Sequence, residues 1–263
     1  MKIQTHFVAY VDILGFGKFV KENPQNPEKP LELLQQFVEK AKMLNLTNTL
    51  NITAFSDNIV ISLLAANPYL QYNNIHEYWD FISYMNTLQA YMITGIGILP
   101  IRGGITFGDF YHDESEILFG EALVEAYDLE HLHAFYPRIV VNPKFLDPNK
   151  FLDDTEGLAE SGLVKNPFEY NFEQLARQYP VAYDYDGVLY CNYLSSLYLG
   201  NNIWADNSLA AIEEHEFFVE RWLMGLWETS DINMLRKYTW MKSYHNWFCE
   251  PFEEFHKYII QDR

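Results

Sequence analysis

The first 145 residues alternate between short apolar runs of strand type and longer amphipathic runs of helical type. An apolar run at residues 6–14 precedes a helical pattern at about 31–44, in which apolar residues recur every three or four positions. Two further β-type runs, NITAF and IVISLL, are joined by Ser56-Asp57-Asn58, which is typical of a hairpin turn. This order disfavours a doubly wound parallel sheet, because hairpins join antiparallel strands.

The alternation continues with a second helical pattern at about 75–94 and then the strand-like run LPIRGGITFGDF, with EILFG as its hairpin partner. A third helix is predicted at 120–133, followed by the strand PRIVV. The complete order is strand, helix, hairpin, helix, hairpin, helix, strand. It predicts an α+β fold with a mostly antiparallel sheet.

The pattern is weaker beyond about residue 145. Mixed turns and a short helix are expected at 146–180, and VAYDYDGVLYCNYL predicts a strand pair with Asp-Gly at its turn. Helices are expected at 208–228 and 232–260, both rich in Trp and Tyr. We therefore expect a first domain at 1–145 and a mainly helical, aromatic-rich extension at 146–263 that packs against it.

Composition narrows the class of partner. Hydrophobic residues make up 49% of the chain, enough to bury a core, and 36 acidic against 18 basic residues give a formal charge of -18. Such a surface repels nucleic acids and anionic membranes, whereas a small polyanion that carries its own divalent metal still fits a local pocket. No run approaches the ~20 apolar residues of a membrane helix, and the two cysteines have no metal-ligand spacing, so a cytoplasmic protein is expected.

Two aspartates are candidates for a metal site. Asp12 interrupts an apolar strand directly before a Gly-Phe-Gly turn, and Asp57 lies at the tip of the first hairpin. If that hairpin pairs beside the first strand, both carboxylates reach one edge of the sheet, where hard oxygen ligands suit Mg²⁺ or Mn²⁺. Taken singly, each aspartate is equally well explained as a turn residue; a charged side chain within an apolar strand favours the joint explanation.

Five segments resemble, in order, the class III nucleotide cyclase domain, and its bacterial anti-phage branch, the Pycsar pyrimidine cyclases, in particular. They are VDILGF, FSDNIVIS, IRGGITFG, FGEALVEAYDLE and YPRIVV, within residues 5–145. The resemblance implies a ferredoxin-like core, a homodimer with the nucleotide site at its interface, and two divalent ions, Mn²⁺ or Mg²⁺. The implied reaction converts UTP to 3′,5′-cyclic UMP and pyrophosphate. The cyclic UMP would be a second messenger for anti-phage defence, to which a separate effector protein responds.

Carried over residue by residue, the resemblance places Asp12 and Asp57 at the metal-ligand positions, with the carbonyl of Ile13 as a backbone ligand. The amides around Leu14, Gly15 and Phe16 would face the triphosphate, as donors in such a turn do.

The positions that read the purine in adenylate and guanylate cyclases correspond to Thr53 and Ile117. Neither supplies the lysine and acidic residues that suit a purine, which favours a smaller base. UTP is preferred to CTP on the resemblance alone, because the Thr53 hydroxyl both donates and accepts and suits either base.

A second departure concerns the transition state. Val124 and Asp128 stand where those cyclases have an asparagine and an arginine. Arg102 and Arg138 are the candidate replacements, and Arg102 is preferred because Gly103-Gly104 permits a close approach. A surface charge at a strand end explains Arg102 equally well.

Three alternatives remain open: a cytidylate cyclase that converts CTP to cCMP, a catalytically inactive nucleotide-sensing homologue, and a related palm-like enzyme such as a polymerase or dinucleotide cyclase. The cluster of Asp109, His112 and Asp113 is interpreted as a solvated hairpin loop rather than as a further metal site.

Overall fold

The computed structural model describes residues 3–45, 49–65, 74–112, 117–145, 177, 179–198, 208–227 and 231–261. Most of the segment 146–180, for which mixed turns and a short helix were expected, lies outside these residues. The described strands are β1 (Gln4–Ile13), β2 (Leu50–Phe55), β3 (Asn58–Leu64), β4 (Ile101–His112), β5 (Leu118–Phe119), β6 (Ile139–Val141), β7 (Val181–Tyr183) and β8 (Leu189–Cys191). The described α-helices are α1 (Phe16–Glu22), α2 (Glu28–Leu44), α3 (Asn74–Tyr91), α4 (Glu121–His133), α7 (Ser195–Tyr198), α8 (Ser208–Trp227) and α9 (Ile232–Cys249).

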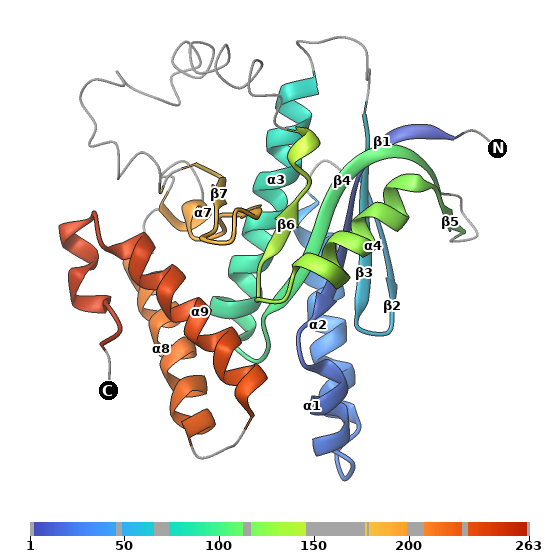
Figure 1. Ribbon diagram of the computed structural model, residues 1–263. Coiled ribbons are helices and arrows are strands. Elements are labelled where there is room, and N and C mark those ends of the chain that lie inside the picture. The colour runs from blue at the N-terminus through green and yellow to red at the C-terminus, as the bar shows by residue number, and fades with distance from the viewer. Residues whose placement is uncertain are drawn as a thin grey trace, which may run out of the picture.

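The strands form one mixed sheet in the order β2-β3-β1-β4-β6-β8-β7, with β5 paired to β4 (Figure 1). Of the pairings between described strands, β4 with β6 is parallel and the others are antiparallel. The prediction of an α+β fold with a mostly antiparallel sheet is therefore confirmed. The predicted β2–β3 hairpin is present, and β3 pairs beside β1.

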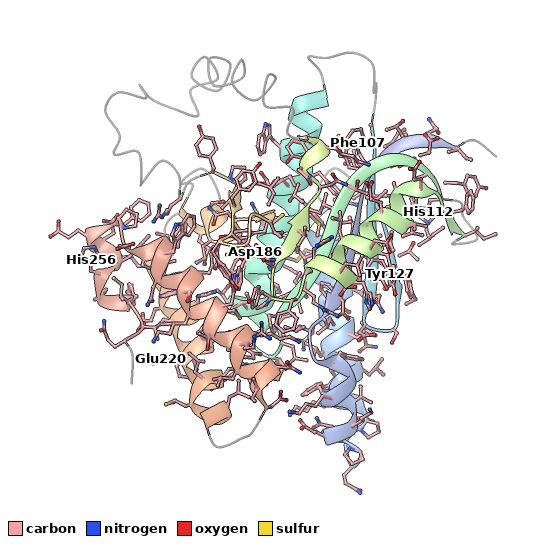
Figure 2. All side chains as sticks on the ribbon, in the orientation of Figure 1. Phe107, His112, Tyr127, Asp186, Glu220 and His256 are labelled. Carbon is pink, nitrogen blue, oxygen red and sulfur yellow. The ribbon has the colours of Figure 1, made fainter. Side chains whose placement is uncertain are left out.

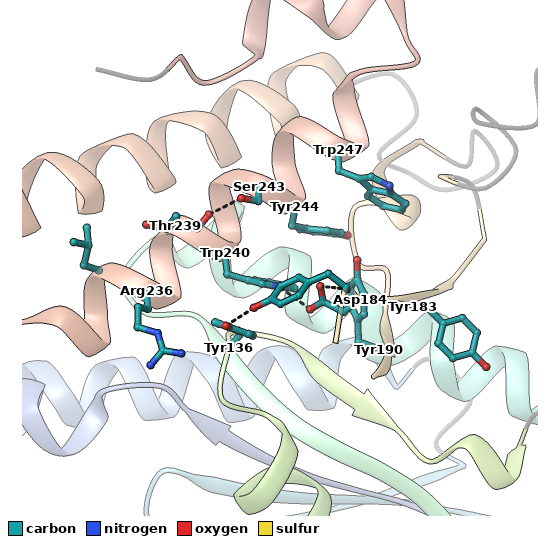
Figure 3. Close-up of a pocket in the computed structure, with 12 residues that line it drawn as sticks. Tyr136, Tyr183, Asp184, Tyr190, Arg236, Thr239, Trp240, Ser243, Tyr244 and Trp247 are labelled. Atoms are coloured by element: carbon teal, nitrogen blue, oxygen red, sulfur yellow. Dashed lines mark hydrogen bonds between the residues drawn. The ribbon is translucent and has the colours of Figure 1, made fainter. Parts of the chain in front are cut away.

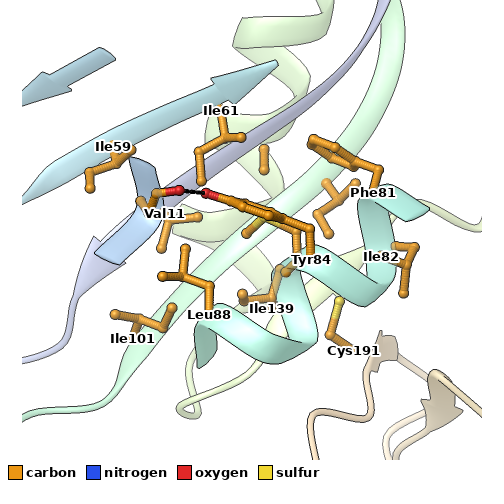
Figure 4. Close-up of a cluster of buried hydrophobic side chains, with 14 of the residues drawn as sticks. Val11, Ile59, Ile61, Phe81, Ile82, Tyr84, Leu88, Ile101, Ile139 and Cys191 are labelled. Atoms are coloured by element: carbon orange, nitrogen blue, oxygen red, sulfur yellow. Dashed lines mark hydrogen bonds between the residues drawn. The ribbon is translucent and has the colours of Figure 1, made fainter. Parts of the chain in front are cut away.

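The two faces of the sheet are covered by different helices. Alternate residues of β1, including Val11 and Ile13, point into a large apolar core with β3 and helices α2 and α3. Figure 4 shows this core around Tyr84, whose hydroxyl donates a hydrogen bond to the Ala41 carbonyl at 2.7 Å. The residues between them, including Tyr10, face α4 on the other side. Because side chains alternate along a strand, Asp12 lies on the α4 face.

Two glycines at the start of β4 permit close approaches, one to α4 and one to β1. A Cβ atom at Gly104 would lie 2.3 Å from the Ala126 carbonyl oxygen of α4, and one at Gly103 would lie 2.6 Å from the Tyr10 carbonyl oxygen. The glycine pair thus serves the approach of a helix and a neighbouring strand, which larger residues would prevent. Its effect is to set the C-terminal half of α4 against the strand that carries Arg102.

The C-terminal part of the chain continues the sheet as well as covering it. Strands β8 and β7 extend the sheet beyond β6, and α8 and α9 form a second apolar core that Tyr190 and Tyr193 join from the β8 side. The predicted helix at 232–260 was too long: α9 ends at Cys249, and a 3-10 helix follows at Glu253–Tyr258. Pro251 explains the break, because proline lacks the amide that a continuing helix needs.

The second predicted helix also ends earlier than expected. Helix α3 stops at Tyr91 and is followed by a π-helical turn at Met92–Ile96, which closes at Gly97 with φ of 63°. Glycine adopts this left-handed conformation without steric cost. None of the described helices has the length and apolar character needed to cross a bilayer.

Candidate active site

Asp12 and Asp57 lie at the same end of the sheet. Asp12 pairs with Asn58 of β3 on one side and with Arg102 of β4 on the other. The turn that holds Asp57 is joined to β1 by a hydrogen bond from the Ile13 amide to the Asp57 carbonyl, 3.1 Å long. Both carboxylates therefore stand at one sheet edge, fixed by strands rather than by long loops.

The Asp12 carboxylate is held by Arg102. The guanidinium Nε donates to Asp12 Oδ2 at 3.0 Å, and Nη1 donates to the Ala134 carbonyl at 3.3 Å. The third contact joins Nη2 to Glu130 Oε1 at 2.8 Å, an ion pair whose angles do not form a regular hydrogen bond. One guanidinium thus bridges two acidic side chains that are mostly buried, at 15% and 5% exposure.

Negative charge exceeds positive charge in this cluster. Burial raises the pKa of Asp12 to about 6 against the lowering effect of Arg102, and the charges of Glu130 and Asp57 raise it further. Burial also raises the pKa of Glu130, again opposed by Arg102. One arginine therefore does not neutralise the site, and further positive charge would stabilise it.

The turn after β1 has the geometry expected of a close approach. Gly15 has φ of 84°, and a Cβ atom there would meet nothing within 4 Å, so the space above it is open. Phe16 and the residues after it begin α1, where the first amides have no acceptor within the helix. The amide of Leu14, however, donates to the Pro100 carbonyl at 2.9 Å. The Leu14 amide therefore has a structural role, whereas the amides of Gly15 and Phe16 remain suitable as donors to a bound ligand.

Thr53 has an unforeseen partner. Its hydroxyl lies 3.2 Å from Nε2 of His112, on the α4 side of β2. The interpretation of Asp109 and His112 as part of a solvated loop was wrong, since β4 extends to His112; Asp113 lies outside the described residues. Figure 2 shows His112 and Tyr127 on the same side of the molecule, beside α4.

The remaining candidates fall in two places. Ile117, Val124 and Asp128 are exposed, and the last two lie on the outer face of α4. None of the three is basic, so none supplies positive charge. Arg138 is 1% exposed and pairs with Asp184 and with Asp186, in the turn between β7 and β8. Arg102 alone of the two predicted arginines contacts Asp12.

Glu130 and Lys237 were missed by the sequence analysis. Glu130 lies near the end of a helix predicted correctly, but only the approach of α4 to Gly104 brings it to Arg102. Lys237 belongs to α9, more than 200 residues after Asp12, and the charges of Arg102 and Asp12 both affect the pKa of its ammonium; no spacing rule connects these residues. Across the described residues, no group of three or more His, Cys, Asp or Glu side chains has the geometry of a metal site.

A cavity of about 570 Å³ lies elsewhere, between α9 and the turn that joins β7 to β8. Figure 3 shows its wall of near-parallel rings, with Trp240 stacked between Tyr136 and Tyr244. Asp184 accepts hydrogen bonds here from Arg138 and, at 2.7 Å, from the Trp240 indole. Neither Asp12 nor Asp57 lines this cavity.

Comparisons with known proteins yield structures only. No known family model matches the sequence, and no curated protein matches it. The chain is similar to the crystal structure of the adenylyl cyclase CyaB from P. aeruginosa, with 16% identity over 58% of this chain and 82% of that chain and a TM-score of 0.44. It is also similar to the guanylyl cyclase Cya2, with 17% identity over 56% and 78% and a TM-score of 0.41. A bacterial light-regulated adenylyl cyclase shows 14% identity over 54% and 43%, with a TM-score of 0.42.

Proposed function

We propose that this chain is a pyrimidine nucleotide cyclase, which converts UTP to 3′,5′-cyclic UMP and pyrophosphate. The observation that carries the proposal is the position of Asp12 and Asp57 at one sheet edge, beside an open glycine turn. The sequence motifs that resemble class III cyclases place the same two residues in metal-binding roles. The excess of negative charge around Asp12 is consistent with a site that receives cations.

The residues present fit two divalent ions, Mn²⁺ or Mg²⁺. Mg²⁺ takes one or two protein carboxylates and completes its shell with water and substrate phosphates, so Asp12, Asp57 and the Ile13 carbonyl form a sufficient donor set. Bound there, the ions would lower the pKa of the ribose 3′-hydroxyl and offset charge on the phosphates. The chain's own part is to hold the two carboxylates rigidly and to offer the amides of Gly15 and Phe16 to the triphosphate.

The proposed reaction is an internal displacement. The 3′-oxygen forms a bond to the α-phosphorus, and the bond from that phosphorus to the α,β-bridging oxygen breaks. Pyrophosphate leaves with the electron pair, and the 3′-hydroxyl proton passes to water. Arg102, which already contacts Asp12, is placed to keep that carboxylate oriented and to offset its charge.

A second copy of the chain is the proposed partner. Apolar side chains are exposed along α4, at β5, at the hairpin tip and just after α4: Phe55, Ile117, Phe119, Val124, Tyr127, Leu132 and Phe135. Exposed apolar groups gathered on one side favour a protein interface. A homodimer would cover them and enclose the nucleotide between subunits.

Thr53 and His112 are proposed to read the base. Their hydroxyl and imidazole form a small polar pair that suits the edge of a pyrimidine. The preference for UTP over CTP rests on the sequence resemblance, and cytidylate cyclase activity is the alternative. A cytoplasmic role in anti-phage defence, with a separate effector that responds to the cyclic nucleotide, completes the proposal.

A second candidate function is nucleotide binding without turnover. Asp128 and Val124 place no positive charge on the outer face of α4. An acidic residue facing a developing negative charge would oppose catalysis. This candidate predicts triphosphate binding with no cyclic product.

Both candidates are tested by incubating the purified protein with each of four radiolabelled nucleoside triphosphates and Mn²⁺, beside Asp57→Ala. We expect cyclic UMP and pyrophosphate from the wild type and at least a ~1,000-fold loss in the variant, since removing a metal ligand removes most transition-state stabilisation. Absence of any cyclic product with retained binding would favour the second candidate. A product that joins two nucleotides, visible by its mass, would favour a dinucleotide cyclase.

A further inference from the structure

Helix α9 of the C-terminal extension begins beside the turn at Gly15 that follows β1. Asp231 caps this helix by accepting a hydrogen bond from the Met234 amide at 3.1 Å. The same carboxylate pairs with Lys18 of α1 at 3.4 Å, three residues after Gly15. Figure 1 shows α9 starting on the side of the molecule where α1 lies. The first turns of α9 are thereby fixed near the proposed triphosphate turn.

Lys237 lies in the second turn of this helix and packs on the ring of Phe135, with Nζ 5.6 Å from the ring centroid. Phe135 directly follows Ala134, whose carbonyl accepts the hydrogen bond from Arg102. A continuous path of contacts therefore runs from Lys237 through Phe135 and Ala134 to Arg102.

The charges of the site act directly on Lys237. Burial lowers the pKa of its ammonium, the charge of Arg102 lowers it further, and Asp231 and Asp12 raise it. These effects agree with the contact path through Phe135, which brings α9 up to the residue beside Ala134, and they indicate that the charges of Arg102 and Asp12 influence the ammonium. Within the described part of the chain, no carboxylate lies within ion-pair distance of Lys237 Nζ. The ammonium is thus a cation of this site that has no fixed anionic partner.

Two other cations near the site, Arg102 and Lys18, are already paired. Arg102 is shared between Asp12 and Glu130, and Lys18 contacts both Glu22 and Asp231. A triphosphate that enters this acidic cluster needs positive charge from the protein as well as from metals, because fixed charges stabilise a transition state without reorganisation.

We propose that Lys237 is a catalytic residue of this chain, whose ammonium binds the triphosphate and neutralises the charge that develops on the departing pyrophosphate. This role rests on the proposed cyclase function and fills the place left by Val124 and Asp128 on α4. It also gives the extension a part in the chemistry, because the cation comes from α9 and the carboxylates from the hairpin and β1. Lysine suits this task, since it binds phosphate as a compact point charge with adjustable donors.

The test compares Lys237→Met and Lys237→Arg with Arg236→Met. The methionine keeps the apolar stem of Lys237 on Phe135 and removes the charge, whereas arginine keeps the charge. Arg236 is the matched control, because it packs on the same ring at 4.9 Å and is exposed. We expect Lys237→Met to lower kcat at least ~10-fold, Lys237→Arg to recover most of the loss, and Arg236→Met to stay within ~2-fold of the wild type.

Calorimetry supplies a readout that does not need turnover. Lys237→Met should weaken the binding of UTP at least ~5-fold and leave the binding of UMP within ~2-fold, since the monophosphate lacks the β- and γ-phosphates. Equal turnover in Lys237→Met and wild type, equal loss in Arg236→Met, or equal weakening of UTP and UMP would each overturn the role of Lys237. If the wild type makes no cyclic product, the cyclase proposal fails, and the UTP-against-UMP comparison still decides whether Lys237 binds the triphosphate.

Discussion

Two regions of this molecule bury polar groups in opposite ways. At the sheet edge, Asp12 and Glu130 share one guanidinium, and the local charge is unbalanced. Between α8 and α9, His215 and His245 are fully buried with parallel rings, and their Nδ1 atoms are 2.9 Å apart. The first cluster is partly open to solvent, and the second is closed.

Hydrogen-bond chemistry fixes every proton in the histidine chain. The Tyr258 carbonyl only accepts, so His245 Nε2 must donate to it across 2.8 Å and His245 Nδ1 must accept. His215 Nδ1 then donates, and His215 Nε2 accepts from the Tyr193 hydroxyl at 2.8 Å. Both rings are neutral, and burial lowers both pKa values, to about 4 for His245. A closed network of this kind stabilises the fold, whereas the unbalanced one at Asp12 is the kind that marks a functional site.

The largest effect that separates the two regions is expected for Asp12→Asn. The asparagine keeps an acceptor for Arg102 and removes the charge, so cyclase activity should fall at least ~1,000-fold, about 4 kcal/mol of transition-state stabilisation. The free energy of unfolding at pH 8 without metal should not fall, because burial of the ionised carboxylate is unfavourable. Urea unfolding and the radiolabel assay measure the two quantities. A loss of more than ~1 kcal/mol in stability would show that Asp12 serves the fold.

The converse is expected for His245→Phe. This change keeps a ring in the core but leaves the His215 Nδ1 proton and the Tyr258 carbonyl without partners, and the free energy of unfolding should fall by about 3 kcal/mol. Turnover per folded molecule should stay within ~2-fold of the wild type, since the buried histidine pair does not contact Asp12. His256→Phe is the control, as that histidine is exposed and its ring hydrogen-bonds the Glu250 carbonyl. A similar loss in the control would assign the effect to the added apolar ring.

The local sequence pattern indicated the region around Asp12 better than the buried histidine pair between α8 and α9. Asp12 was chosen as a candidate because a charged residue stood in an apolar strand, and Asp57 because it lay at the tip of a predicted hairpin. The pairing of β3 beside β1 was a condition of that expectation, and it is present in the structure. The hydrogen bond from the Leu14 amide to the Pro100 carbonyl was not predicted, because it depends on the course of the chain before β4.

The contacts that the sequence did not reveal are those between distant segments. His112 reaches Thr53 only because β4 runs further than its turn-like residues suggested. Glu130 reaches Arg102 only through a helix seated on Gly104, and Lys237 comes from the C-terminal extension. His215 and His245 belong to two helices, and neither spacing nor composition indicated that they would meet. Tertiary packing decided each of these, and periodicity along one segment contains no information about it.

The smallest and most discriminating effect concerns pH. In metal-free protein, Asp12 has a folded pKa of about 6, above its ordinary 3.8, so its contribution to stability is present at low pH and is lost as pH rises from about 4 to 6. His245 has a folded pKa of about 4, below its ordinary 6.5, so its contribution is present above pH 6.5 and is lost as pH falls to about 4. Each group contributes a slope of at most about 1.4 kcal/mol per pH unit, with opposite signs.

Urea unfolding between pH 4 and 7.5 with a chelator separates the two slopes. The stability of Asp12→Asn relative to wild type should increase with pH up to about 6, because the variant lacks the unfavourable ionisation. The stability of His245→Phe relative to wild type should decrease over 4 to 6.5, because only the wild type gains from a neutral buried ring. Difference curves that are both flat, or that slope the same way, would mean that the unbalanced cluster and the closed chain respond alike to protons.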